Sequence, residues 1–333
     1  WVAPAHKKIK ELKDLKTDKD SVFKSRLSCQ LPHTMVIYEK RFKVTLRLLL
    51  IRHGLSSYNV EQRIQGRNDL SVLTEEGKHQ AFKTGSALSG IPINAIYSSP
   101  LKRAASSTEE ILKGLNLKID PIYDNGLLEV DLGNWSGLTM KELQGKYPDD
   151  YKVWQSDPNE LQIINKEGKK YRPMKELMLQ AKDFINRLLT KHSPESNQTI
   201  IIVAHNAILR CIILFLLTEP EQGFRRIRLD NASFSVINIL GKIDDHYTCQ
   251  IECLNNTSHL RNNLRDKGKG SRIILVRHGE TDWNLQGRFQ GQIDIPLNSN
   301  GENQAKAAKD YLKYEKMDKA YSSTLSRPIK TAK

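Results

Sequence analysis

The sequence is poor in cysteine, which excludes two common ways of stabilising or equipping a fold. Four cysteines occur among 333 residues, and they follow no two-by-two metal-binding spacing: Cys29, Cys211, Cys249 and Cys253. A zinc site and a disulfide framework both need paired, regularly spaced cysteines. We therefore expect free thiols, no bound metal and no other cofactor.

The chain also lacks an uninterrupted apolar run of membrane length. Its longest apolar passage, residues 199–217, is broken by His205, Asn206 and Arg210, whereas a membrane helix needs about 20 consecutive apolar residues. That pattern is typical of a strand followed by a helix. The first residues combine lysines with no apolar segment of the signal-peptide kind. We expect a cytoplasmic protein with no membrane partner.

Acidic residues are outnumbered, at 38 against 52 basic ones, so the formal net charge is +14. The lysines are spread thinly, and no motif interleaves basic with aromatic residues, so we do not expect nucleic acid as a partner. The summed field of such a surface favours anionic substrates. Nothing in the sequence predicts the oligomeric state.

Residues 1–43 differ in composition from the rest of the chain. They hold 9 Lys and 2 Arg against 5 acidic residues, with no sustained apolar period. A segment of this kind buries too little apolar surface to fold. We expect a disordered basic extension that is dispensable for folding. Because the chain begins with Trp1 and not Met, we also expect that part of the extension does not belong to the natural protein.

From residue 44 onwards, short apolar β-rich runs alternate with helical patterns. Strands are expected at "LRLLLI", "NAIYSS" and "TIIIVAH", and a hairpin at "ASFSVINIL" and "YTCQIECL". Alternating strands and helices predict a three-layer α/β/α fold with a mostly parallel sheet. We expect this domain to span 44–258, followed by a polar linker over 259–271. The predicted helices are Thr74–Ser89, Pro100–Leu115, Met174–Lys191 and Ala207–Leu217.

A pattern near the start of this domain returns late in the chain. "LLLIRHGLSSYN" at 48–59 recurs as "IILVRHGETDWN" at 273–284, and the match continues beyond both stretches. Two copies of one domain explain this most simply. The counterparts of Glu129 and His205 would lie beyond Lys333, so we expect 272–333 to be the N-terminal fragment of a second domain, poorly folded alone and inactive. Its matching site residues are Arg277, His278, Asn284 and Arg327.

Two predicted strands end in residues suited to binding an anion. The first delivers Arg52 and His53, and the other delivers His205 and Asn206. Ligands of open α/β sheets bind outside the carboxyl ends of the strands, where N–H groups of the following helices point outward. Two histidines and an arginine at such ends form a cationic pocket for a phosphoryl group.

A third strand end and an acidic segment add to this pocket. Ser99 is a good N-cap, and Arg103 lies one turn into the helix that follows, where a guanidinium can engage two phosphate oxygens. The extended segment 127–139 carries Glu129 and Asp131 on one face. Either carboxyl can serve as the general acid for a leaving group.

This ordered set resembles the histidine phosphatase superfamily, the phosphoglycerate mutase-like enzymes, over roughly 44–258. The resemblance rests on "RHG" with Asn59 after it, "RIQG", "SSPLKRA", "LLEVDLGNWSG" and "VAHN". It implies a phosphoglycerate mutase-like fold in which His53 becomes phosphohistidine and Glu129 is the general acid. It further implies phosphoryl-binding roles for Arg52, Arg103 and His205 and an assisting role for Asn59.

Other positions stay open. Gln65 and Gly66 either contact substrate or close a loop, Asp131 lies at the pocket rim, and Trp135 packs in the core. We expect a phosphomonoester hydrolase of the histidine acid phosphatase and phosphoglycerate mutase family, acting on a small phosphorylated metabolite. Mutase-type phosphoryl transfer, which makes the enzyme an isomerase, and a catalytically silent phosphate-binding module are the alternatives. The substrate lid is expected within 141–171.

Overall fold

The computed structural model describes residues 10–11, 46–165, 168–219, 221–243, 246–261 and 263–333. Contacts divide the chain into two compact units. We call them the large unit, with described residues from Leu46 to Leu260, and the C-terminal unit, from Arg261 to Lys333 together with Lys10 and Glu11. Most of the predicted basic extension lies outside the described residues. No helix among those described is both long and apolar enough to cross a membrane.

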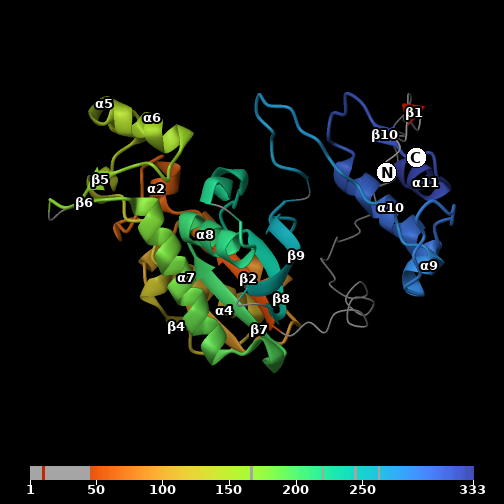
Figure 1. Ribbon diagram of the computed structural model, residues 1–333, viewed down its shortest axis with the longest axis horizontal. Helices are drawn as coiled ribbons and strands as arrows, with labels where there is room; N and C mark the ends of the chain where they lie inside the picture. The colour runs from red at the N-terminus through yellow and green to blue at the C-terminus, as the bar shows by residue number, and fades with distance from the viewer. Residues whose placement is uncertain (1–9, 12–45, 166–167, 220, 244–245, 262) are drawn as a thin grey trace. The chain divides into compact units, whose positions relative to one another are not determined.

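A six-stranded sheet forms the centre of the large unit (Figure 1). Its strand order is β4-β3-β7-β2-β8-β9. The first four strands are parallel, and β8 and β9 form an antiparallel hairpin at one edge. This confirms the mostly parallel sheet and the late hairpin predicted above. The strands are β2 (Leu46–Arg52), β3 (Ala95–Ser98), β4 (Ile122–Tyr123), β7 (Gln198–Ala204), β8 (Phe234–Ile243) and β9 (His246–Asn256).

Alternation along the central strands divides the core into two layers. In β2, Leu48 and Leu50 join one hydrophobic cluster, whereas Leu49 and Ile51 join the other. Successive strand residues point to opposite faces of a sheet, so a strand covered on both faces must be apolar throughout. The continuous apolar run of β2 follows from this requirement.

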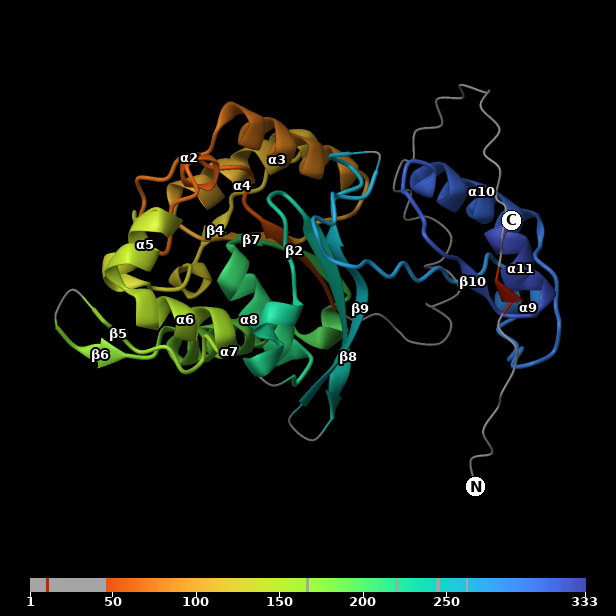
Figure 2. The same cartoon turned by 90° about the horizontal axis from the view of Figure 1, so that it is seen from above.

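Helices cover both faces of the sheet, as Figure 2 shows edge-on. α3 (Glu75–Ala87) and α4 (Lys102–Leu115) pack on one face through residues such as Ile111. α7 (Pro173–Lys191) and α8 (Asn206–Leu216) pack on the other through residues such as Phe184. The predicted three-layer α/β/α fold is therefore confirmed, and each predicted helix agrees with the observed one to within two residues.

The region predicted as a lid contains several short elements. They are α5 (Met140–Lys146), α6 (Pro148–Ser156), β5 (Ile163–Ile164) and β6 (Lys170–Tyr171), with β5 and β6 antiparallel. Trp135 anchors this region to the core: it is 2% exposed, and its ring lies 6.2 Å from that of Trp154 on α6. The packing role predicted for Trp135 is confirmed. The remaining short elements of the large unit are α2 (Ser57–Val60), η1 (Asn125–Leu127), η2 (Gly133–Trp135), η3 (Pro194–Ser196) and η4 (Glu221–Arg226).

The C-terminal unit contains helices but no counterpart of β2 within its described residues. The matching segment 273–276 is not in a strand, and the side chains of Ile273 and Leu275 are 85% and 91% exposed. An apolar run that is buried in the large unit therefore faces solvent here, which is the physical basis of the expected poor folding. The elements are β1 (Lys10–Glu11), antiparallel to β10 (Tyr321–Ser322), and the helices α9 (Asp282–Leu285), α10 (Ser299–Leu312) and α11 (Ser326–Ala332).

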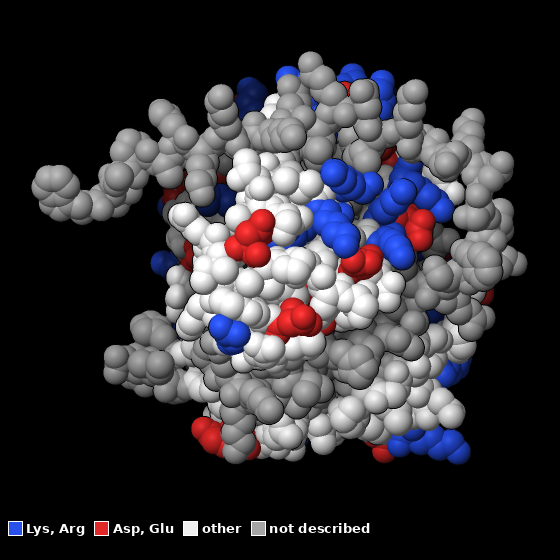
Figure 3. Space-filling model, turned by 90° about the vertical axis from the view of Figure 1, so that its right-hand side faces the viewer, with Lys and Arg blue, Asp and Glu red and all other residues white. Residues whose placement is uncertain are grey.

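One surface view illustrates how the basic residues are distributed. In the described part of the face in Figure 3, Lys and Arg side chains gather toward the upper right with Asp and Glu side chains among them. The excess of basic residues does not form an acid-free patch on that part of the surface.

A close approach of two glycines fixes the loop after β2. A Cβ on Gly54 would lie 2.3 Å from the carbonyl oxygen of Gly77, and a Cβ on Gly77 would lie 2.1 Å from that of Leu55. Both positions therefore require glycine. The C-terminal unit repeats the arrangement with Gly279 and Gly301, where the corresponding distance is 2.2 Å. The matched sequence positions thus keep the same local backbone packing in both units.

Candidate active site

Three parallel strands of the large unit end side by side. The sheet register pairs Arg52 with Ala204 and Ser98 with Val203. His53 N–H donates to the Ala204 carbonyl at 3.0 Å, so the residues that follow β2 and β7 stay adjacent beyond the sheet. The two predicted histidines, His53 and His205, are brought together in this way.

The two histidine rings are buried and close. Their centroids are 5.2 Å apart, and the residues are 2% and 0% exposed. His53 Nδ1 lies 2.7 Å from the Gly54 carbonyl oxygen. Because a carbonyl only accepts hydrogen bonds, Nδ1 carries the proton and Nε2 keeps its lone pair. His205 Nε2 lies 2.7 Å from Ser99 Oγ. The prediction that Ser99 is the N-cap of the following helix is wrong, because α4 begins at Lys102 and its N-cap is Leu101.

The environment keeps both imidazoles neutral. Burial holds the pKa of His53 well below its usual range, and the charges of Arg103 and Arg52 lower it further. The pKa of His205 is lowered by burial first and then by the same arginines and His53. A buried neutral imidazole with a free lone pair is a nucleophile at neutral pH without any metal.

Arg103 is fully buried and held by a loop. Its two Nη atoms donate to the carbonyls of Asn68 and Gly66 at 2.9 and 2.8 Å, and its Nε is buried without a partner. Gly66 has φ +47°, and a Cβ there would lie 2.7 Å from Ser136 Oγ. Gln65 Oε1 accepts from Ser56 and Ser71 within the same loop. These contacts place Gln65 and Gly66 in loop closure.

Arg52 is held in a similar way to Arg103. Its Nη1 donates to the Leu229 carbonyl at 2.7 Å, and its Nε is buried without a partner. Burial lowers the pKa of Arg52 to about 10, which the carboxylate of Glu129 partly opposes. At neutral pH the guanidinium therefore remains charged and keeps a buried free donor at Nε.

Asn59 fixes the loop after β2 through Asn231, a residue that was not predicted from the sequence. Asn59 Oδ1 accepts from Asn231 Nδ2 at 3.0 Å, and the same amide donates to the carbonyls of His53 and Gly54 at 3.2 and 3.1 Å. Asn231, in the segment before β8, thus holds the loop that carries His53. No sequence pattern marks it, because it lies in an irregular loop 178 residues away.

The two candidate acids, Glu129 and Asp131, lie in different surroundings. Glu129 is 8% exposed and lies at the N-terminus of α8, where it accepts from the backbone N–H groups of Ala207 and Ile208 at 3.1 to 3.2 Å. Its Oε2 takes a single bond, from Ala207, whereas Oε1 takes several. Asp131 points elsewhere: its side chain is 42% exposed and lies 3.9 Å from Arg67.

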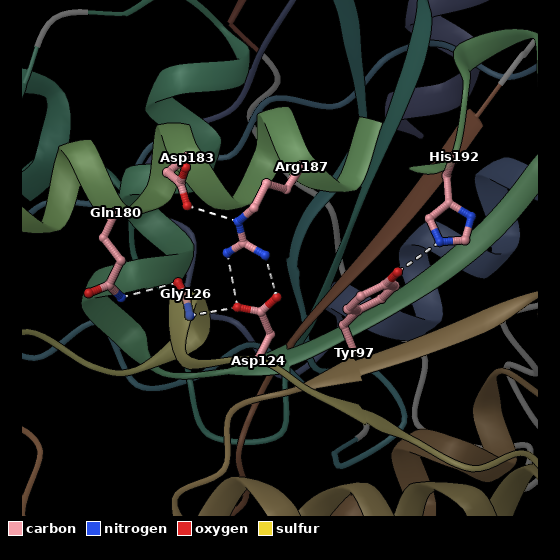
Figure 4. A network of polar contacts seen from close by, with 7 residues as sticks. All are labelled: Tyr97, Asp124, Gly126, Gln180, Asp183, Arg187 and His192. Atoms are coloured by element: carbon pink, nitrogen blue, oxygen red, sulfur yellow. Dashed lines mark hydrogen bonds and ion pairs between the residues drawn. The ribbon is translucent and has the colours of Figure 1, made fainter. Parts of the chain in front are cut away.

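A polar network from α7 positions the segment that carries Glu129 (Figure 4). Gln180 donates to the Gly126 carbonyl at 3.1 Å, and Arg187 forms two bonds to Asp124 at 2.7 and 3.0 Å. Asp124 in turn caps η1 by accepting from Gly126 N–H. Arg187 lowers the pKa of Asp124, which keeps this carboxylate ionised. The turn before Glu129 is therefore anchored to the helix layer.

A polar pocket of about 640 Å³ opens beside this segment. Its lining combines amide, hydroxyl and charged groups, which suits a polar ligand. Within the described residues, no group of three His, Cys, Asp or Glu side chains is arranged to hold a metal ion. The lining residues are Arg67, Asn68, Asp69, Asp131, Gly133, Asn134, Ser136 and Asn165.

The C-terminal unit repeats part of this geometry. Arg327 donates to the carbonyls of Ile293 and Gly291 at 2.8 and 3.0 Å, the positions that match Asn68 and Gly66, and its Nε donates to His278 Nε2 at 3.3 Å. Asn284 Oδ1 accepts from Thr281, as Asn59 does from Ser56. Arg277, by contrast, is exposed. Local loop contacts are thus retained, while the strand-end arginine is not in place.

Comparison with known proteins matches the segments that carry these motifs. A family model described as "Histidine phosphatase superfamily (branch 1)" matches residues 48–257 and 273–333. The protein named probable 2-carboxy-D-arabinitol-1-phosphatase of Arabidopsis thaliana is 32% identical over 244 residues, which cover 72% of this chain and 48% of that protein. The chain thus spans about half the length of that relative.

Two further relatives match the large unit in size. Phosphoserine phosphatase 1 of Hydrogenobacter thermophilus is 33% identical over 194 residues, covering 58% of this chain and 87% of that protein. The solved structure of phosphoserine phosphatase from Entamoeba histolytica in complex with 3-phosphoglyceric acid has a TM-score of 0.53 and 27% identity. The match covers 65% of this chain and 100% of that one.

The lowered histidine pKa values predict an acid-sensitive fold. Below about pH 6.5 an unfolded histidine is protonated, while His53 and His205 stay neutral in the folded state, so the unfolded state binds more protons. Stability is therefore fully present above about pH 6.5 and falls with falling pH, by at most about 1.4 kcal/mol per pH unit for each histidine. Urea unfolding at pH 7.5 and 5.5 should show a smaller loss for His205→Gln than for the unmodified chain. An equal loss in both would contradict the assignment.

Proposed function

Because this chain belongs to the histidine phosphatase superfamily, we propose that its large unit hydrolyses phosphomonoesters of small metabolites through a phosphohistidine on His53. The supporting observation is a set of buried polar atoms without partners. Ten such side-chain atoms occur among the described residues, and three of them belong to Arg52, Arg103 and His205. Buried polar groups are normally satisfied, so these three mark a place built to donate hydrogen bonds to a ligand.

The free donors fit a phosphoryl group. Arg52 and Arg103 each spend Nη atoms on loop carbonyls and keep Nε free. His205 Nδ1 is a third free group in the same place. Phosphoryl transfer depends mainly on positioning and on fixed charge around the equatorial oxygens, which such pre-placed donors supply.

The proposed reaction has two steps. In the first, His53 Nε2 attacks phosphorus, the bond to the ester oxygen breaks, and Glu129 gives its proton to that oxygen. In the second, Glu129 takes a proton from water, the water oxygen attacks phosphorus, and the bond to Nε2 breaks to release phosphate. Glu129 Oε2, which has a single backbone donor, is the oxygen available to carry the proton.

Hydrolysis is favoured over transfer because the relatives compared above are named as phosphatases. Their names also place the substrate among small phosphorylated metabolites. A mutase would return the phosphoryl group to 3-phosphoglycerate, and a silent binding module would release no phosphate. Phosphate release without isomerisation therefore separates the three.

Two further expectations belong to this proposal. Residues 272–333 are taken as part of a second copy of the domain, because they keep the contact of His278 Nδ1 with the Gly279 carbonyl and the two carbonyl bonds of Arg327. A cytoplasmic location remains a prediction from the sequence.

The role of Glu129 predicts a dependence on the leaving group. Glu129→Gln keeps the side-chain size but removes the proton, so hydrolysis of alkyl phosphates should slow by about 10²-fold or more. Hydrolysis of para-nitrophenyl phosphate should slow much less, because nitrophenolate leaves without a proton. Asp131→Asn serves as the matched control and should show no such dependence. Equal slowing of Glu129→Gln across a leaving-group series would move the acid role elsewhere.

The C-terminal unit should contribute nothing to turnover. Its residues 261–333 contain one histidine, His278, and so have no partner equivalent to His205. His278→Ala in the full chain should leave the phosphatase rate unchanged. A loss of more than about tenfold, on the order of 1.4 kcal/mol of barrier, would show that this unit takes part.

A further inference from the structure

Arg210 is a half-buried cation for which the proposed reaction gives no use. It lies in α8, and its Nε is buried without a hydrogen-bond partner. Its guanidinium carbon lies 5.0 Å from the centre of the Phe224 ring. Within the described part of the chain, no carboxylate forms an ion pair with it. A charge held partly out of water without such a partner is costly, and a ligand that supplies an anion would remove that cost.

Positively charged side chains outnumber carboxylates around Arg210. Burial lowers its pKa, the carboxylate of Glu129 raises it, and Arg225 and Arg228 lower it. The other cations have partners: Arg228 bonds to Asp230 at 3.2 Å, and Arg225 donates to the Trp154 carbonyl. Glu129 is itself held by the N-terminus of α8. Arg210 is therefore the cation of this group that remains open to an anion.

The place of Arg210 in α8 sets its distance from the phosphoryl site. It lies four residues after Asn206, so the two share one face of the helix, about 6 Å apart along the axis. Asn206 Oδ1 is also buried without a partner. His205, which belongs to the phosphoryl site, directly precedes Asn206. Along α8, the Asn206 amide and then the Arg210 guanidinium thus follow the hydrogen-bond donors of the phosphoryl site.

We propose that Arg210 and Asn206 form a second anion-binding subsite, which selects phosphomonoesters that carry a carboxylate or a second phosphate on a short carbon skeleton. This inference rests on the proposed phosphatase function and extends it to the substrate class. A planar guanidinium binds two oxygens of a carboxylate or a phosphate at once. An uncharged substrate group such as a hydroxyl cannot form this paired, charge-assisted contact. The Asn206 amide would bind a hydroxyl on the carbons between the two anionic groups.

The test compares three substrates that share a three-carbon skeleton. Glycerol 3-phosphate lacks a second anion, 3-phosphoglycerate adds a carboxylate, and glycerol 1,3-bisphosphate adds a phosphate. The unmodified chain should show a kcat/KM at least about tenfold higher for one of the two charged compounds than for glycerol 3-phosphate. The preferred compound identifies the anion.

Variants then assign that preference to Arg210. Arg210→Met should abolish it, mainly through KM, while the rates on glycerol 3-phosphate and para-nitrophenyl phosphate change less than about threefold. Arg210→Lys keeps the charge without the planar fork and should restore part of the preference. Arg226→Met, which removes an exposed arginine of the same region, is the matched control and should change neither rate.

Several results would overturn the inference. They are the absence of any preference in the unmodified chain, a preference that survives Arg210→Met, and an equal loss on all substrates in that variant. Turnover of para-nitrophenyl phosphate but of none of the three-carbon compounds would also reject this substrate class while leaving the phosphatase proposal intact. No turnover of any phosphomonoester would reject both.

Discussion

The burial of positive charge at the ends of three parallel strands is the constraint on which the rest of the site depends. Arg52 and Arg103 are removed from water, and desolvation lowers the pKa of each. Backbone carbonyls of nearby loops accept hydrogen bonds from Nη atoms of both side chains, which offsets part of the cost of this burial, while each Nε stays without a partner. The same charges help to keep His53 neutral. In the proposed reaction, one arrangement therefore serves both phosphate binding and the nucleophile.

The C-terminal unit shows which contacts of this arrangement form without the complete sheet and which of them need it. Arg327 keeps the two carbonyl bonds of its counterpart and approaches His278, because those partners lie 34 to 49 residues away within the same unit. Arg277 is exposed and the apolar run before it faces solvent, because both need a sheet around them. The loop contacts are thus encoded locally, whereas the buried strand end requires the neighbouring strands.

The same distinction explains what the sequence could predict. Apolar runs and helix periods gave the sheet, its covering helices and the strand-end positions of His53 and His205. Family motifs then singled out Glu129 from Asp131, a choice that alternation along the chain left open. Asn231 and the unpartnered Arg210 were not predicted as site residues. Their roles follow from contacts between distant segments, and neither stands in a pattern that marks such contacts.

The most direct test of the account is to trap the phosphorylated enzyme. Rapid quenching of the full chain with a ³²P-labelled phosphomonoester should yield a protein-bound label that is stable in base and lost in acid. Peptide mapping at neutral or basic pH should place the label on His53, and His53→Ala should show neither label nor turnover. A label on another residue, or turnover at an unchanged rate in His53→Ala, would contradict the central claim.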